Sequence, residues 1–365
     1  MNKIFNGKRI LVTGACGTIG SELIKQLLTN DMYSPDEIIG LDNNENSIFF
    51  IDQAYLNFKN VRFVVSDIKN LEALKNKFKG IDIVFHTAAL KHVILCERSP
   101  DQAVETNILG IQNVIEAANF NNVDKVIFTS SDKAVNPTNV MGTSKLMGER
   151  LITAANSNKY GQRTIFASTR FGNVLGSNGS VIPIFHNQII KGGPITLTDQ
   201  AMTRFVMSID EAVHLVIDSS LKAQGGEVFI TKMPVVRILD LAKAMIDLLA
   251  PKYGFDKNKI EISEIGQKPG EKLYEELMSN EETRRAIELK DYFSVLPAFR
   301  GIYHNISYNY ENIISSKVDK AYISEDEASL TIDEIKQILK KNNLLEKPDQ
   351  SILRRYWPGD KEQNS

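Results

Sequence analysis

Cysteine and histidine are scarce in this chain of 365 residues, which contains two cysteines and five histidines. Cys16 and Cys96 alone cannot form the disulfide framework that stabilises many small secreted domains. The cysteines and histidines also lack the close paired spacing that is typical of zinc sites. We therefore expect neither structural disulfides nor a bound metal ion.

Long apolar runs and a strong net charge are absent as well. No stretch of about 18 consecutive apolar residues occurs, and the Met1 end has no basic segment followed by an apolar one, as a secretion signal would have. These absences lead us to expect a cytoplasmic protein without a membrane partner. The formal net charge of -2 gives no reason to expect a nucleic-acid partner, although a local basic cleft for a phosphorylated ligand is compatible with it.

The pattern that is present is an alternation of two periodicities. Short apolar runs rich in β-branched residues alternate with segments, such as 22–28 and 101–118, whose apolar residues recur three and four positions apart. This alternation is typical of a parallel sheet covered by helices. We therefore predict an α/β fold, a Rossmann-like doubly wound parallel sheet with a smaller C-terminal substrate lobe. The expected strands are 9–12, 37–41, 61–65, 81–85, 125–129 and 164–168.

A glycine-rich segment, ILVTGACGTIGSELIKQLL, places Gly14, Gly17 and Gly20 between the first expected strand and the first expected helix. Glycine permits backbone angles and close approaches that a Cβ forbids, so a pyrophosphate can lie against the helix N-terminus. A glycine triplet alone is weak evidence. Here a strand precedes it, a helix follows it, and an acid, Asp42, stands at the end of the next strand, which makes a dinucleotide site a specific prediction.

Asp42 decides which dinucleotide is expected. Its carboxylate stands where it can bind both ribose hydroxyls of the adenosine half and would repel a 2′-phosphate, so we predict NAD rather than NADP. The alternative is an ordinary cap or turn Asp. Asp67, after the third strand, either reaches the adenine or makes a turn. The expected cofactor contacts are Gly14, Gly17, Thr18, Ile19, Gly20, Asp42, Asp67, Ile68, Ala88 and Lys145.

Domain boundaries follow from where the alternating pattern weakens. Residues 1–170 carry the pattern and are predicted to form the NAD-binding Rossmann domain, whereas 171–345, richer in Gly, Pro and short elements, should form mainly a substrate-binding lobe. Residues 346–365 are polar around the sequence RRYWPGD. They form either a frayed tail or an arm that packs on a neighbouring subunit.

The segment SSDKAVNPTNVMGTSK, residues 130–145, raises a question about catalysis. In many oxidoreductases with a nucleotide cofactor, a Tyr stands four residues before a Lys at such a place and transfers a proton. This chain has Met141 there, and a thioether carries no proton at ordinary pH. The chain is therefore an inactive enzyme, a binding protein, or an enzyme that moves protons with other groups.

The sequence resembles the extended short-chain dehydrogenase/reductase superfamily and, within it, the 4,6-dehydratases that act on nucleotide-linked N-acetylglucosamine. The resemblance rests on six motifs in the family's order, and Met in place of Tyr resembles the retaining type. Larger members of that subgroup add a membrane segment, and this chain is more similar to soluble relatives from legionaminic-acid-type pathways. The motifs are GACGTIG, HTAALKHV, SSDKAVNPTNVMGTSK, RFGNVLGSNGSVIPIF, MTRFVMSIDEA and KPGEKLYEEL.

The resemblance implies roles for residues after the fifth strand. Asp132 would protonate the leaving O6 hydroxyl and Lys133 would take the C5 proton, which requires a protonated carboxyl and a neutral amine that burial or neighbours must favour. Ser131 would orient O4, while Asp132 or a water accepts its proton. Lys145 would hold the nicotinamide ribose. Met141 is either an apolar wall beside the sugar or an ordinary core residue, and the alternative for Asp132 and Lys133 is a surface ion pair.

The expected substrate is UDP- or GDP-N-acetylglucosamine, and we expect a homo-oligomer. Asn173 resembles the family's contact to the nucleotide phosphates, Arg204 its pyrophosphate ligand and Glu271 a contact to the nucleoside ribose. Lys91 follows the fourth strand and should point toward the substrate. Two alternatives to a retaining dehydratase are an inverting enzyme that also epimerises C5 and an NAD-binding sensor without catalysis.

Overall fold

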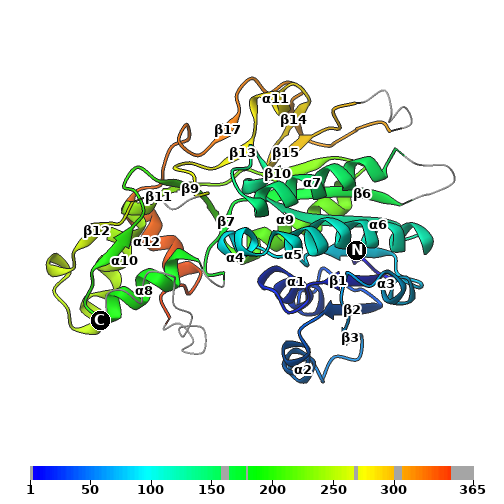
Figure 1. The fold of residues 1–365 in the computed structure, drawn as a ribbon, viewed down its shortest axis with the longest axis horizontal. Coiled ribbons are helices and arrows are strands. Elements are labelled where there is room, and N and C mark those ends of the chain that lie inside the picture. Colours follow the sequence, from blue (N-terminus) through cyan, green and yellow to red (C-terminus); the bar gives the residue numbers. More distant parts are fainter. Residues whose placement is uncertain (1–2, 158–163, 178–179, 267–269, 300–305, 347–365) are drawn as a thin grey trace. The chain divides into compact units, whose positions relative to one another are not determined.

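The structure is a computed structural model that describes residues 3–157, 164–177, 180–266, 270–299 and 306–346 (Figure 1). The predicted C-terminal tail lies almost wholly outside these described residues. Within them, no helix is both long enough and apolar enough to cross a membrane.

A ten-stranded sheet forms the centre of the first of two compact units. Its order is β16-β14-β15-β10-β6-β5-β4-β1-β2-β3, in which the six predicted strands are parallel neighbours, so the predicted doubly wound fold is confirmed. Each predicted strand lies within a few residues of its expected bounds. The strands are β1 (Arg9–Thr13), β2 (Glu37–Asp42), β3 (Val61–Val65), β4 (Ile83–His86), β5 (Lys125–Ser131), β6 (Ile165–Phe171), β10 (Val228–Thr231), β14 (Ala286–Leu289), β15 (Tyr292–Val295) and β16 (Ile313–Ser315).

Helices cover the sheet by packing on the side chains that its strands direct, alternately, to the two faces. Leu11, Val84 and Phe128 belong to a core that α3, α6 and α7 close, while α1 and α9 pack together. The intervening residues of each strand point to the other face. The helices of this unit are α1 (Thr18–Thr29), α2 (Glu45–Ala54), α3 (Leu71–Lys77), α4 (Val93–Arg98), α5 (Pro100–Val104), α6 (Gly110–Phe120), α7 (Val140–Ala155), α9 (Ile209–Lys222) and α11 (Asn280–Thr283), with a short 3-10 turn η2 (Asp132–Ala134).

The chain first passes from one unit to the other between residues 172 and 173, close to the predicted cut near residue 170, but two later segments belong to the first unit. The first unit takes residues up to 172 and also 209–233 and 275–326, and the second unit takes 173–208, 234–274 and the described residues from 327. The reason is hydrogen bonding: β10 pairs parallel with β6, and β15 pairs antiparallel with β10, so both complete the first unit's sheet. The composition of the sequence gives no sign that β10 and β15 rejoin the sheet of the first unit.

The described part of the second unit consists of small sheets and short and long helices around its own core. Phe185, Leu241, Met245 and Leu339 are buried there. A capping box begins the last helix, in which Thr331 and Glu334 bind each other's backbone N–H groups. Its elements are β7 (Asn173–Val174), α8 (Val181–Ile190), β8 (Ile195–Leu197), β9 (Thr203–Met207), β11 (Val235–Arg237), α10 (Ile238–Leu249), η3 (Pro251–Tyr253), η4 (Lys257–Lys259), β12 (Ile262–Glu264) and α12 (Ile332–Lys341).

A buried ion cluster joins three elements of the first unit. Arg170 on β6 binds Glu149 on α7 through Nε at 3.0 Å and Nη2 at 2.6 Å, and it binds both oxygens of Glu282 on α11 at 3.0 Å. A further donor reaches the carbonyl of Leu277 in β13 (Glu276–Met278) at 2.8 Å. Burial would raise the pKa of Glu282, but the attraction and hydrogen bonds of Arg170 hold it at about 2. This carboxylate therefore stabilises the fold above pH 4.5, and that contribution is lost as the pH falls toward 2.

We predict that Arg170→Met lowers the free energy of unfolding by about 3–5 kcal/mol, because it leaves two buried carboxylates without their cation. Urea unfolding followed by circular dichroism measures this loss. The matched control also replaces Glu149 and Glu282 by Gln, which removes the stranded charge and should recover part of the stability. A single variant within about 1 kcal/mol of the original protein would contradict the role of the cluster.

Candidate functional site

The glycine turn between β1 and α1 is packed so closely against its own backbone that side chains at its glycines would not fit. Gly14 has φ of +70°, and a Cβ there would lie 2.7 Å from backbone atoms of Ala88. A Cβ on Gly20 would lie 2.2 Å from the carbonyl oxygen of Gly14. Gly17 is the N-cap of α1 and provides no side-chain cap, so the first turn of this helix presents backbone N–H groups of the kind that bind phosphate.

Asp42 ends β2 and is tied to the glycine turn. Its carboxylate accepts the backbone N–H of Cys16 at 3.1 Å and that of Asn44 at 3.0 Å, so its position is fixed relative to the turn. Burial and then the charge of Asp42 raise the pKa of the Cys16 thiol to about 12. The thiol therefore stays protonated at neutral pH, which argues against redox chemistry there.

Three further expected cofactor contacts, Asp67, Ile68 and Ala88, follow the carboxyl ends of β3 and β4. Asp67 accepts the N–H of Lys69 at 2.9 Å, as a turn Asp does. This contact does not decide between the two roles expected for Asp67, a contact to the adenine and a turn. Ile68 is buried, and a Cβ on Gly110 would lie 2.7 Å from its Cδ1. A glycine turn, a helix N-terminus without a side-chain cap and the carboxylate of Asp42 beside them fit the prediction of a dinucleotide site.

Asp132 and Lys133 form η2 directly after β5. The Asp132 side chain is 1% exposed, and its Oδ1 accepts the Ser131 hydroxyl at 2.5 Å and the backbone N–H of Lys133 at 2.9 Å. Lys133 Nζ lies 3.2 and 3.3 Å from the two carboxylate oxygens of Asp132. The alternative of a surface ion pair is therefore wrong for Asp132, since its carboxyl is enclosed.

Sequence reasoning missed Glu275, which reaches the same lysine from far along the chain. Its Oε1 lies 3.2 Å from Lys133 Nζ, across 142 positions, and its side chain is 4% exposed. The motif KPGEKLYEEL contains this residue, but no spacing in the sequence could relate it to Lys133. Only the packing of β13 against η2 does so.

Helix α7 begins with Asn139 as its N-cap and carries both Met141 and Lys145. Lys145 Nζ donates to the carbonyl of Thr129 at 3.0 Å and lies 4.8 Å from the centre of the Phe128 ring. Burial lowers the pKa of Lys145 to about 8, against the opposing effects of Glu149 and Cys96. A lysine that is easily neutralised is compatible with a contact to a sugar hydroxyl.

Met141 is buried, 3% exposed, in a small cluster with Cys96 and Ala103. Val93 and Val140 pack against this cluster. The thioether itself cannot carry a proton at ordinary pH. The contacts agree with an apolar wall and equally with a core methionine.

Asn107 is a second residue that sequence reasoning missed. It lies in η1 (Glu105–Leu109), a π-helical turn that joins α5 to α6 where a regular helix over 101–118 was expected. Its amide group accepts the N–H of Leu90 at 2.8 Å and donates to the Leu90 carbonyl and to Ser144 Oγ, each at 2.9 Å. It thereby fixes the segment that carries Lys91, an exposed residue, to helix α7.

The expected nucleotide contacts all belong to the second unit. Arg204 on β9 donates to the carbonyls of Thr203, Lys272 and Leu273, and its Nη2 lies 3.8 Å from Glu271. The structure therefore brings Arg204 and Glu271 together. Glu271 Oε2 is buried without a hydrogen-bond partner among the described residues, and Asn173 Nδ2 donates to the carbonyl of Phe205 at 3.3 Å.

Comparison with known proteins places these features in a family. The profile of the family described as "Polysaccharide biosynthesis protein" matches residues 10–297. The chain belongs to that family. A UDP-N-acetylglucosamine 4,6-dehydratase (inverting) of Campylobacter jejuni is 37% identical over 298 residues, which are 81% of this chain and 85% of that protein. A UDP-glucose 4-epimerase of Rickettsia bellii is 36% identical over 336 residues, 92% of this chain and 96% of that protein.

Among solved structures, that of Pen from Bacillus thuringiensis is similar over almost the whole chain of this polysaccharide-biosynthesis family member. It is 40% identical, covers 94% of this chain and 100% of its own, and superposes with a TM-score of 0.86. Relatives named as a dehydratase and as an epimerase are thus about equally similar in sequence. The family is that of nucleotide-sugar dehydratases and epimerases, and the choice between them rests on the residues of the site.

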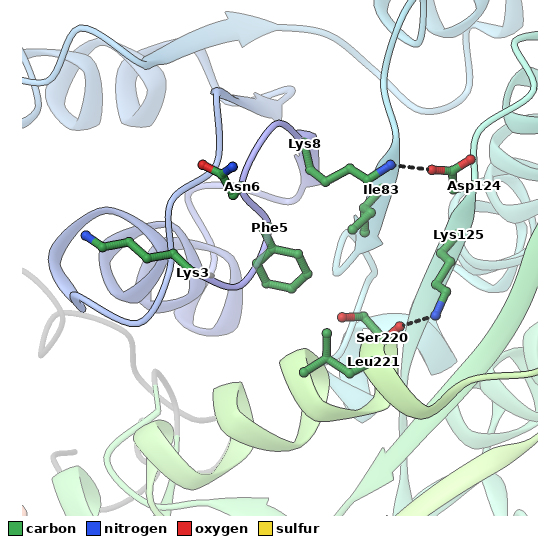
Figure 2. Close-up of a pocket in the computed structure, with 9 residues that line it drawn as sticks. All are labelled: Lys3, Phe5, Asn6, Lys8, Ile83, Asp124, Lys125, Ser220 and Leu221. Carbon is green, nitrogen blue, oxygen red and sulfur yellow. Dashed lines mark hydrogen bonds and ion pairs between the residues drawn. The ribbon is translucent and has the colours of Figure 1, made fainter. Parts of the chain in front are cut away.

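A pocket of about 380 Å³ lies elsewhere, at the amino ends of β1, β4 and β5 (Figure 2). Lys8 binds Asp124 there at 2.8 Å, and Lys125 donates to the carbonyl of Ser220 at 2.6 Å. Ligands of doubly wound sheets bind at the carboxyl ends of the strands. This pocket therefore lies at the opposite ends of the strands from Asp132, which follows the carboxyl end of β5.

We predict that the chain binds NAD at least about tenfold more tightly than NADP, a difference of roughly 1.4 kcal/mol, because Asp42 repels a 2′-phosphate. Isothermal titration of the cofactor-free protein with each dinucleotide measures the ratio. The variant Asp42→Asn removes this repulsion and should bring the affinities for NAD and NADP closer together. Equal affinities in the original protein would mean that Asp42 does not contact the ribose.

Proposed function

We propose that this protein is an NAD-dependent, retaining 4,6-dehydratase that converts UDP- or GDP-N-acetylglucosamine to the 4-keto-6-deoxy sugar nucleotide. Such a product would serve the synthesis of bacterial surface or glycoprotein sugars of the legionaminic-acid type. The observation that carries the proposal is the enclosed Asp132 beside Lys133 at the carboxyl end of β5. An elimination needs an acid and a base together at one place, and this pair supplies both.

The cofactor would be held by the glycine turn, the N-terminus of α1, Asp42 and Lys145. NAD, when bound, supplies a hydride acceptor for sugar C4 and a hydride donor for C6. The resulting ketone at C4 makes the C5 proton acidic, so that a lysine amine can remove it. Lys145, held by the Thr129 carbonyl, would bind the nicotinamide ribose, as the resemblance implies.

The chain's own residues would carry the protons. Ser131, which already donates to Asp132 Oδ1, would orient O4, and Asp132 would take the O4 proton. Asp132 would then deliver that proton to O6 as the C6–O6 bond breaks, while Lys133 Nζ takes the C5 proton. The same lysine can return a proton to the same face of C5, which gives retention.

Three other readings compete with this proposal. A 4-epimerase, as the relative from Rickettsia is named, needs no group that eliminates water, so the pair Asp132–Lys133 argues against it. An inverting dehydratase, which also epimerises C5, is disfavoured only by the resemblance of Met141 to the retaining type. An NAD-binding sensor would need the glycine turn and Asp42 but not the pair.

The proposed activity predicts loss of one water per nucleotide sugar without net use of NADH. Purified protein is mixed with UDP- or GDP-N-acetylglucosamine and the product mass is measured, while NADH absorbance is followed. Steady consumption of added NADH in step with product would indicate a reductase instead. A product of unchanged mass but altered C4 stereochemistry would indicate an epimerase.

Variants at the site should separate the acid from the apolar wall. Asp132→Asn keeps the shape but cannot deliver a proton, so turnover should fall about 10²- to 10⁴-fold. Met141→Leu is the matched control, because it conserves volume and also lacks a proton, and it should keep most of the activity. If Asp132→Asn turned over normally, the acid would be wrongly assigned.

A further inference from the structure

Lys133 lies between two carboxyl groups, and the proposed chemistry so far uses only one of them. Its Nζ is 3.2 Å from Asp132 Oδ1 and 3.2 Å from Glu275 Oε1. Both carboxyl side chains are almost fully enclosed, while that of Lys133 is 26% exposed. A lysine that must be neutral to act as a base is therefore held by two groups that favour its charged form, and the structure has to resolve this conflict.

Backbone contacts fix Glu275 in this position. Its N–H donates to Ser324 Oγ at 2.9 Å, and the Ser324 N–H donates to its carbonyl at 2.9 Å. The next residue, Glu276, accepts from Asn136 Nδ2 at 2.6 Å. The strand that follows Glu275 pairs with β17 (Tyr322–Ile323). The contact between Glu275 and Lys133 thus belongs to a built junction of β13 with η2.

The summed charge of Asp132, Lys133 and Glu275 suggests which protonation state of this trio is favoured. With Asp132 and Glu275 ionised and Lys133 protonated, the trio of Asp132, Lys133 and Glu275 carries one net negative charge. One added proton makes it neutral, which is the least costly state for enclosed groups. Helix α7, which packs on η2, carries the charged residues Lys145, Glu149 and Arg150; Glu149 is paired with Arg170, and Arg150 is exposed.

We propose that Glu275 is the proton reservoir of Lys133, a further catalytic-site residue that holds the lysine's proton while the amine acts on C5. This inference rests on the proposed dehydratase function. A proton moves from Lys133 Nζ to Glu275 Oε1, which leaves a neutral amine and a carboxylic acid. In a low-dielectric site such a neutral pair competes with the ion pair, because no charge then needs solvation.

Proton and electron counts close over one turnover. Asp132 takes the O4 proton, Lys133 gives its proton to Glu275, and the amine then takes the C5 proton. The electrons of the C5–H bond form the C5–C6 double bond, the C6–O6 bond breaks, and Asp132 protonates O6, which leaves as water. After a hydride has returned to C6, Lys133 gives the proton back to C5, and Glu275 returns its proton to the lysine. No outside acid or base is required.

The test is Glu275→Gln, which can still accept a hydrogen bond from Lys133 but cannot take its proton. Turnover at neutral pH should fall by about 10²-fold or more, with little change in KM. It should also recover as the pH rises, because the lysine must then lose its proton to solvent. Exchange of deuterium into C5 from heavy water should fall in parallel with turnover.

Two variants serve as controls. Glu276→Gln alters the neighbouring enclosed carboxyl, which binds Asn136, and should keep the pH dependence of the original protein. Glu275→Asp retains a carboxyl and should keep that pH dependence at a lower rate, which separates proton transfer from a folding defect.

The outcomes distinguish this inference from the proposed function. A normal rate in Glu275→Gln, or a loss that is equal at every pH, would overturn the reservoir role and leave the dehydratase proposal standing. An original protein that removes no water from either nucleotide sugar would overturn both. Alkaline recovery confined to Glu275→Gln supports the reservoir.

Discussion

Pairing of buried charge at the carboxyl ends of β5 and β6 is the constraint on which the first unit depends. Ser130 on β5 lies opposite Arg170 on β6 in the parallel register. Two charge clusters therefore form next to each other, one around Arg170 and one around Lys133, and each places two carboxylates around one central cation. A buried ion without a partner costs several kcal/mol, so the elements that supply the partners cannot move independently.

The same elements serve both clusters. Helix α7 supplies Glu149 to Arg170 and also carries Met141 and Lys145, while the segment from Glu275 through α11 supplies Glu275 to Lys133 and Glu282 to Arg170. The guanidinium also binds the carbonyl of Leu277, two residues beyond Glu275. Arg170 thus holds in place the strand that delivers Glu275. The cluster around Arg170 and the proposed catalytic cluster around Lys133 are therefore built on one set of elements.

The sequence predicted the features that are local in the chain. The six parallel strands, the glycine turn and Asp42 are each read from a few neighbouring residues, since strand periodicity and turn chemistry act over short distances. Other features depend on contacts between residues that are far apart in the sequence, and no local pattern of apolar residues can predict them. These features are the contact of Glu275 with Lys133, the contacts of Asn107 and the pairing of β10 with the sheet. The cofactor and substrate contacts expected from the resemblance stay predictions.

The proposed proton transfers explain why the enzyme would not need a tyrosine at position 141. A tyrosine at that place would be needed to accept the O4 proton or to protonate C5 from the other face. In the proposed mechanism Asp132 accepts the O4 proton and delivers it to O6, and Lys133 returns to C5 the proton that it removed. Every proton then has a donor and an acceptor within Asp132, Lys133 and Glu275, whose contacts are 3.2 to 3.3 Å long. In that scheme a tyrosine has no proton to transfer, and position 141 can hold an apolar Met141 packed on Cys96 and Ala103.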